Sequence, residues 1–275
     1  MKAAKALYIT DLDGTILDKN ERVPQESIEI LNRLISEGLA LSYATARSIV
    51  SASKVTEGLH ITVPVITNNG VAIVHPQTRE ILYSIAFEEE DLYKLIEYIK
   101  KHDIYPVVYS YINGVEKCSY TQGKETPAVI NYLNQPVRKV DKRVNPVSTY
   151  DELFAGIIYY IICMGAEHDF DEICKEVEAE DRYKCFLGEQ LYNSDFWFEI
   201  MPKNATKSNA ILKLKEMLGY DRIVCFGDGI NDISMFRIAD ECYAVENAEE
   251  ELKAIATAVI GSNEENGVAK WLEAN

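Results

Sequence analysis

Short apolar runs alternate with amphipathic segments at both ends of the chain. In the opening third, patterns typical of buried strands are followed by stretches with apolar residues every three or four positions, the spacing typical of helices. The predicted order is strand 6–10, helix 25–37, strand 39–44, helix 47–57 and strand 63–67. This β-α-β alternation predicts a parallel, doubly wound sheet with right-handed crossovers, because parallel strands need a crossover segment to connect them.

The middle of the chain has a different pattern, in which strands come in pairs and helices are interspersed. The dipeptide Asn113-Gly114 between two strand patterns is a hairpin signal. The α/β alternation then resumes with a strand at 197–200. We therefore predict two domains: a Rossmann-like α/β core of residues 1–85 and 192–275, and an inserted α+β cap domain of residues 86–191.

The composition argues against two classes of partner. The chain has 28 Lys+Arg against 44 Asp+Glu, a net charge of −16, and such a field repels nucleic acid and anionic membrane surfaces. Its 6 cysteines lie at irregular spacings without a C-x-x-C pair, which is typical of reduced thiols. The longest nearly apolar run, 153–166, is too short to span a bilayer. We expect a cytoplasmic protein with no nucleic-acid or membrane partner.

Two strand ends carry carboxylates. Asp11 and Asp13 directly follow the first strand, and Asp228 and Asp232 follow the apolar run 223–226 in the same way. The carboxyl ends of parallel strands form the ligand crevice of an open α/β sheet. If the two strands are neighbours, Asp11, the backbone carbonyl of Asp13 and Asp228 supply hard oxygen ligands for Mg²⁺. Asp232 would contact the metal through water.

Two further positions suit a phosphorylated substrate. Thr45 follows the second strand and offers a hydroxyl to a phosphoryl oxygen, with Ala46 beside it as a second phosphate-binding position. Lys207 supplies a positive charge that would neutralise the phosphoryl group and keep Asp11 ionised. Each position also has an ordinary explanation, a helix cap for Thr45, a solvated side chain for Lys207 and turn residues for the aspartates.

Together these residues resemble the four motifs of the haloacid dehalogenase superfamily of phosphohydrolases. The motifs are D-x-D-G-T at 11–15, a hydroxyl residue at Thr45, a lysine at Lys207 and G-D-x-x-N-D at 227–232. The resemblance is closest to the Cof-type phosphatases, which carry a large α/β cap between the second and third motifs, and it covers nearly the whole chain. Ala46 departs from the pattern, because many relatives have glycine there.

The resemblance implies a two-step phosphoryl transfer with Mg²⁺ as the cofactor. The carboxylate of Asp11 would attack phosphorus and form an aspartyl phosphate, while Asp13 acts first as general acid and then as general base. Asn231 and Asp232 are expected to support the metal ligands, and Asn69 is a candidate for substrate contact. The expected substrate is a small phosphorylated metabolite such as a sugar phosphate, because a closing cap excludes bulky polymers.

Two alternatives remain open. A phosphomutase would share the same residues and transfer the phosphate to a second sugar hydroxyl instead of water. A non-catalytic sensor would bind a phosphorylated metabolite but would have no need of a nucleophile at Asp11. A dehalogenase is disfavoured, because it would need neither an acid at Asp13 nor a metal site, and a phosphonatase would use a lysine from a different, helical cap.

Overall fold

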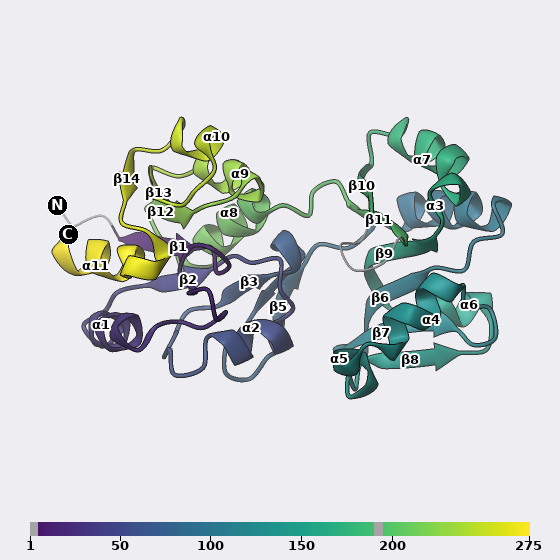
Figure 1. Ribbon diagram of the computed structural model, residues 1–275, viewed down its shortest axis with the longest axis horizontal. Coiled ribbons are helices and arrows are strands. Elements are labelled where there is room, and N and C mark those ends of the chain that lie inside the picture. The colour runs from purple at the N-terminus through teal and green to yellow at the C-terminus, as the bar shows by residue number, and fades with distance from the viewer. Residues whose placement is uncertain (1–4, 190–194) are drawn as a thin grey trace. The chain divides into compact units, whose positions relative to one another are not determined.

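The computed structural model describes residues 5–189 and 195–275, and the chain divides into two compact units (Figure 1). The first unit comprises Met1–Ser84 and Ala205–Asn275, and the second comprises Ile85–Asn204. The predicted division between residues 191 and 192 lies outside the described residues. Each unit is built around its own main sheet.

The first unit is built around a five-stranded parallel sheet in the order β14-β13-β12-β1-β2. Its strands are β1 (Ala6–Thr10), β2 (Leu41–Tyr43), β12 (Arg222–Gly227), β13 (Glu241–Val245) and β14 (Ala258–Ile260). Its helices are α1 (Gln25–Ser36), α2 (Ile49–Val55), α8 (Lys207–Leu218), α9 (Ile233–Phe236), α10 (Glu250–Lys253) and α11 (Gly267–Ala274). The chain leaves β1 in one direction and β12 in the other, so right-handed crossovers place α1 and α9 on opposite faces. The predicted doubly wound α/β class is confirmed.

The central strands of this sheet are buried on both faces. Val224 and Cys225 are consecutive in β12 and point to opposite faces, and they are 3% and 0% exposed, as expected for a parallel strand covered by helices on both sides. Helix α1 packs against α11. The Trp271 ring of α11 lies 5.3 Å from the Phe226 ring of β12 and 4.1 Å from the Tyr243 ring of β13, measured between centroids. This packing holds β12, whose end carries Asp228, against β13, and each such ring pair contributes about 0.5–1.5 kcal/mol beyond its buried area.

A second, smaller sheet in the first unit is antiparallel and has the order β3-β4-β5. Its strands are β3 (Val65–Thr67), β4 (Ala72–Val74) and β5 (Ile81–Ser84). The segment 63–67 was expected as a third strand of the parallel sheet, but it is joined to that sheet by a single bridge between Ala44 and Ile66. The turn Asn68–Gly70, whose three residues all have positive φ, reverses the chain so that β3 pairs with β4 instead.

The second unit holds a six-stranded mixed sheet in the order β10-β11-β9-β6-β7-β8. Its strands are β6 (Val107–Ile112), β7 (Val115–Thr121), β8 (Val144–Val147), β9 (Ile157–Gly165), β10 (Tyr183–Glu189) and β11 (Phe196–Pro202). Its helices are α3 (Glu89–Lys101), α4 (Pro127–Asn134), α5 (Pro136–Lys139), α6 (Tyr150–Leu153) and α7 (Asp171–Glu178). The predicted hairpin at Asn113-Gly114 is confirmed, since both residues have positive φ and join the antiparallel pair β6 and β7.

Strand β11 belongs to the sheet of the second unit, not to the parallel sheet of the first. It pairs antiparallel with β10 and β9, so the prediction that 197–200 resumes the first sheet was wrong. Phe198 and Ile200 are fully buried in the core of the second unit, with Leu95 of α3 and Ile173 of α7. A short apolar run is compatible with either sheet, because its sequence does not determine which strands it pairs with.

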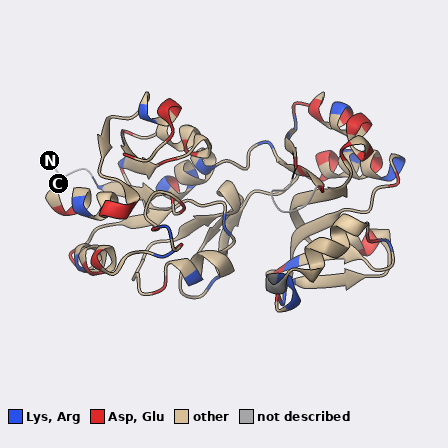
Figure 2. Ribbon diagram, in the orientation of Figure 1, with Lys and Arg blue, Asp and Glu red and all other residues tan. Residues whose placement is uncertain are grey.

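Charged side chains are spread over both units. In Figure 2 the red and blue segments lie mainly on helices and loops of each unit, whereas the strands are mostly tan. The negative net charge is therefore distributed over the surface, not gathered in one element. Within residues 5–189 and 195–275, none of the helices combines the length and the apolar character that crossing a bilayer requires.

Candidate active site

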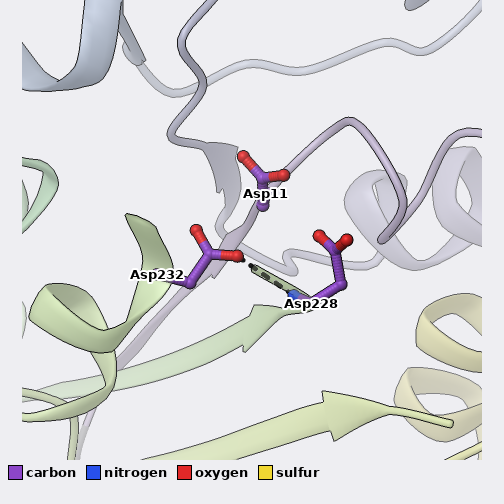
Figure 3. Close-up of side chains that lie close together, drawn as sticks. All are labelled: Asp11, Asp228 and Asp232. Atoms are coloured by element: carbon purple, nitrogen blue, oxygen red, sulfur yellow. Dashed lines mark hydrogen bonds between the residues drawn. The ribbon is translucent and has the colours of Figure 1, made fainter. Parts of the chain in front are cut away.

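The carboxyl ends of β1 and β12 lie side by side, which is the condition on which the predicted metal site depends. The two strands pair in parallel up to Thr10 and Phe226, and the N–H of Asp11 donates to the Phe226 carbonyl at 2.9 Å. Asp11, Asp228 and Asp232 converge here, and each offers a carboxylate oxygen within 4.8 Å of the others (Figure 3). This is the switch point of the sheet, where open α/β sheets carry their ligands.

Lys207 joins two of these carboxylates. It is the first residue of α8, and the preceding Thr206 caps the helix by accepting the N–H of Asn209. The Lys207 Nζ donates to Asp11 Oδ1 at 2.5 Å and to Asp232 Oδ1 at 2.7 Å. The side chain is only 1% exposed, so the alternative of a solvated lysine is wrong. Burial alone would lower the pKa of Lys207, but Asp11 and Asp232 outweigh it and raise the pKa, which keeps the ammonium charged.

Asp232 is the best-anchored carboxylate of the cluster. Its side chain has no exposed surface. Its Oδ2 accepts the backbone N–H groups of Asp228 at 3.0 Å and Gly229 at 3.1 Å, while Oδ1 faces Lys207. Asp232 therefore ties the loop after β12 to α8, a contact that the sequence analysis did not predict. A water-mediated contact between Asp232 and a metal stays a prediction.

Gly14 allows the first loop to approach Asp228. Its φ is +73°, and a Cβ added there would lie 2.2 Å from Asp228 Oδ2. The Thr15 hydroxyl donates to Asp228 Oδ1 at 2.8 Å. The Asn247 side-chain amide donates to the Gly14 carbonyl at 2.7 Å, so the loop after β13 also holds this turn. The first and last motifs are thus joined by direct contacts.

Thr45 is fully buried and Ala46 beside it is exposed. The following helix α2 begins later than predicted and is capped by Ser48, so the helix-cap alternative for Thr45 is wrong. The Thr45 hydroxyl oxygen accepts the N–H of Arg47 at 3.1 Å. The Thr45 carbonyl accepts the N–H of Asn69 at 2.9 Å, and the buried Asn69 Oδ1 has no hydrogen-bond partner among the described residues.

Asp13 is not one of the three clustered carboxylates and pairs with an arginine instead. Its side chain is 50% exposed and pairs with Arg47, whose Nη2 donates to Asp13 Oδ1 at 2.5 Å and whose Nε donates to Oδ2 at 2.8 Å. The sequence analysis assigned no role to Arg47, because a lone arginine after a hydroxyl residue does not indicate its partner. Asn231, the expected support for Asp228, is exposed in the short turn Ile230–Asp232. The metal contact through the Asp13 carbonyl stays a prediction.

The donor set fits a divalent cation. Three carboxylates and one ammonium leave an excess of negative charge in a largely buried site. Burial raises the pKa of Asp11 to about 7, although Lys207 partly offsets it, and burial raises the pKa of Asp228 to about 6 despite the Thr15 hydroxyl. A cation bound between the carboxylates would remove this cost, and oxygen ligands of this kind suit Mg²⁺.

These features define an α/β enzyme with an acidic, metal-compatible site at the switch point of its sheet. Residues 8–272 match the family described as haloacid dehalogenase-like hydrolases. The chain belongs to this family, and the resemblance noted in its motifs is confirmed.

Relatives of known name span nearly the whole chain. It is 27% identical to the 5-amino-6-(5-phospho-D-ribitylamino)uracil phosphatase YwtE of Bacillus subtilis, over 96% of this chain and 95% of that protein. It is 26% identical to the phosphatase YwpJ of the same organism, over 97% and 98%. The crystal structure of TM0651 from Thermotoga maritima has a TM-score of 0.77 at 26% identity, covering 99% of this chain and 97% of that one. A haloacid dehalogenase-like hydrolase from Bacteroides thetaiotaomicron has the same fold, with a TM-score of 0.73 at 20% identity over 98% and 99% of the two chains.

Proposed function

We propose that this hydrolase is a magnesium-dependent phosphatase that acts on small phosphate monoesters through an aspartyl-phosphate intermediate. The observation that carries the proposal is the contact between the Asp11 carboxylate and the buried Lys207 ammonium at 2.5 Å, beside the carboxylate of Asp228. A nucleophilic carboxylate, a fixed cation and a set of oxygen ligands are the parts that phosphoryl transfer needs. The two Bacillus subtilis relatives named as phosphatases support the same reaction class.

In the first step, Asp11 is the nucleophile. One of its carboxylate oxygens bonds to phosphorus while the bond between phosphorus and the leaving oxygen breaks. Lys207 neutralises part of the charge that the carboxylate and the phosphoryl oxygens share. The Thr45 hydroxyl and the N–H of Ala46 are proposed to donate to the phosphoryl oxygens, as the motif resemblance implies.

Asp13 moves the protons. It gives a proton to the leaving oxygen, which departs as an alcohol, and is left as a carboxylate. It then takes a proton from water as the water oxygen bonds to phosphorus and the bond to Asp11 breaks. Inorganic phosphate leaves, Asp11 is regenerated as a carboxylate and Asp13 again carries its proton.

The metal and the remaining residues complete the proposal. Asp11, Asp228 and the Asp13 carbonyl would hold Mg²⁺, with Asn231 and Asp232 in support, and the bound ion would supply positive charge that stabilises the transferring group. Asn69 is proposed to contact the substrate, because its buried side-chain oxygen lacks a partner among the described residues.

The second unit is proposed to determine the choice of substrate. We assign residues 85–204 the role of a cap that selects the leaving group, on the basis of the family resemblance.

The protein is proposed to be cytoplasmic. All 6 cysteines are unpaired, which agrees with a reducing, cytoplasmic location.

The test is phosphate release from a panel of phosphate monoesters, with Mg²⁺ present or chelated by EDTA. The panel includes sugar phosphates and 5-amino-6-(5-phospho-D-ribitylamino)uracil, for which one relative is named. Release that depends on Mg²⁺, is lost in Asp11→Asn and persists in the exposed control Asp221→Asn supports the proposal. Release that survives Asp11→Asn excludes Asp11 as the nucleophile. Phosphate recovered on a second sugar hydroxyl indicates a phosphomutase, and binding without turnover indicates a sensor.

A further inference from the structure

The guanidinium of Arg47 donates hydrogen bonds to both carboxylate oxygens of Asp13. Its Nε donates to Oδ1 at 3.1 Å and to Oδ2 at 2.8 Å, and its Nη2 donates to Oδ1 at 2.5 Å. The planar fork of arginine matches a carboxylate in this two-point manner, whereas a lysine ammonium offers only a point charge. The plane of the Asp13 carboxylate is therefore set by Arg47.

Arg47 is itself anchored independently of Asp13. Its Nη2 also donates to Glu21 Oε2 at 2.8 Å, and its Nη1 donates to the Ser51 hydroxyl of α2 at 3.2 Å. Its backbone N–H donates to the Thr45 hydroxyl oxygen at 3.1 Å, and its carbonyl accepts the N–H of Asn68 at 3.0 Å. The Arg47 side chain is 19% exposed, against 50% for Asp13. The better-buried partner of the pair is thus the one that orients the other.

We propose that Arg47 is a positioning residue that holds the Asp13 carboxylate in one orientation for its acid-base steps. An aspartate on a half-exposed loop would otherwise sample several rotamers, and a misplacement of about 1 Å can cost about 10²-fold in rate. Oδ1 accepts two bonds from Arg47 and Oδ2 accepts one, so Oδ2 is the oxygen with room for the transferred proton. The inference rests on the proposed function, since it assigns Asp13 the role given there.

The same contacts argue against Arg47 as a direct substrate ligand. Its Nε donor is directed at Asp13, and both Nη2 donors are used by Asp13 and Glu21. Three of its five N–H donors already face protein carboxylates and a fourth faces Ser51, and exchanging the carboxylates for a phosphoryl oxygen gains little. The effect of Arg47 on the reaction should therefore pass through Asp13.

The test compares two aryl esters that differ in their need for an acid. The 4-nitrophenolate ion leaves without a proton, whereas phenolate is a poorer leaving group that gains from protonation. General acid catalysis contributes about 10²–10⁴-fold, so Arg47→Ala should lower kcat/KM for phenyl phosphate by about tenfold or more and that for 4-nitrophenyl phosphate by less than about threefold. Arg47→Lys, which keeps the charge without the fork, should show the same split. Added guanidinium should restore phenyl phosphate turnover in Arg47→Ala.

Two controls separate this role from loss of structure. Arg33→Ala removes an exposed guanidinium that pairs with Glu37 and Glu273 in the same unit, and it should leave both rates unchanged. In an Asp13→Asn background, Arg47→Ala should lower phenyl phosphate turnover by less than about twofold, because residues that act as a unit are not additive.

Several results would overturn the inference. Equal loss for the two esters in Arg47→Lys, no rescue by guanidinium of a folded Arg47→Ala protein, or an undiminished loss in the Asp13→Asn background would each do so. The proposed function is judged separately, by whether the unaltered protein releases phosphate and loses this activity on Asp11→Asn.

Discussion

Replacing Lys207 by methionine removes the ammonium that pairs with Asp11 and Asp232 and leaves the volume of the side chain nearly filled. Lys207 is 1% exposed and lies between Asp11 and Asp232, which are 7% and 0% exposed. After the change, Asp232 keeps the backbone N–H groups of Asp228 and Gly229. Asp11 loses its charged partner, so the cost of Lys207→Met falls mainly on Asp11.

The magnitude follows from the loss of a buried ion pair, to which the protonation of Asp11 adds. Its pKa is already raised to about 7 from an ordinary 3.8, because of burial, and it must rise further without Lys207. In EDTA at pH 7 Asp11 is therefore about half protonated in the folded unaltered protein and fully protonated in the folded variant, so protonation alone accounts for less than about 1 kcal/mol. The larger part is the loss of the buried ion pair, typically about 3–5 kcal/mol when one partner is removed.

The pH dependence of the free energy of unfolding of the Lys207→Met variant has a definite sign. The pKa of Asp11 in the folded variant lies above its unfolded value, so the free energy of unfolding falls as the pH rises above 3.8. In the unaltered protein this fall ends near pH 7, the folded pKa of Asp11, whereas in the variant it continues at higher pH. The destabilisation by Lys207→Met should thus be larger at pH 9 than at pH 7, by up to about 1.4 kcal/mol per pH unit.

The assay is urea unfolding followed by tryptophan fluorescence, with EDTA present throughout. The chain has 2 tryptophans, so a Trp197→Phe background leaves Trp271 of α11 as the reporter of the first unit. Lys213→Met is the matched control on the same helix, since Lys213 pairs with Glu216 at the surface and its removal should have no measurable effect. A loss below about 1 kcal/mol at pH 7, or a loss that is no larger at pH 9 than at pH 7, would refute the reasoning.

Three further predictions concern other parts of the molecule. Gly14→Ala should abolish Mg²⁺ binding measured by calorimetry, because the added Cβ would lie 2.2 Å from Asp228 Oδ2; unchanged binding contradicts this. The thiols of Cys174 and Cys185 should resist iodoacetamide at pH 8 until the protein is unfolded, because burial raises their pKa values to about 11 and about 12; mass spectrometry showing alkylation of the native protein would disprove it. Phe198→Ala should lower the free energy of unfolding of the second unit by about 3–5 kcal/mol in urea titrations, since its side chain is fully buried in that core; a neutral result would exclude a central packing role.

The convergence of Asp11 and Asp228 could be anticipated from the sequence. Each follows a short apolar strand, and parallel strands in one sheet present their carboxyl ends at the same edge. The partners of Asp232 and Asp13 could not be anticipated. Asp232 turns toward Lys207 because backbone N–H groups of the preceding loop hold its other oxygen, and Asp13 turns toward Arg47, which is a tertiary contact that no local pattern encodes.

In the fold, too, elements with local sequence signals could be predicted, whereas pairings that depend on tertiary contacts could not. Periodicity was sufficient for α1, and the turn dipeptide was sufficient for the hairpin at Asn113-Gly114, because both signals are contained in the segments themselves. It was insufficient for β11, whose partners lie elsewhere in the second unit, and for β14 and β8. Those strands were not predicted, because β14 is largely exposed and β8 contains Pro146.

The central claim is that Asp11 carries the phosphoryl group during turnover. Acid quenching of the enzyme with substrate and Mg²⁺, followed by borohydride reduction of any acyl phosphate and peptide mass spectrometry, tests it directly. The account predicts that Asp11 alone is reduced to the corresponding alcohol, and that the modification is absent without substrate. Turnover that continues while Asp11 stays unmodified, or a phosphoryl group trapped on another side chain, would contradict it.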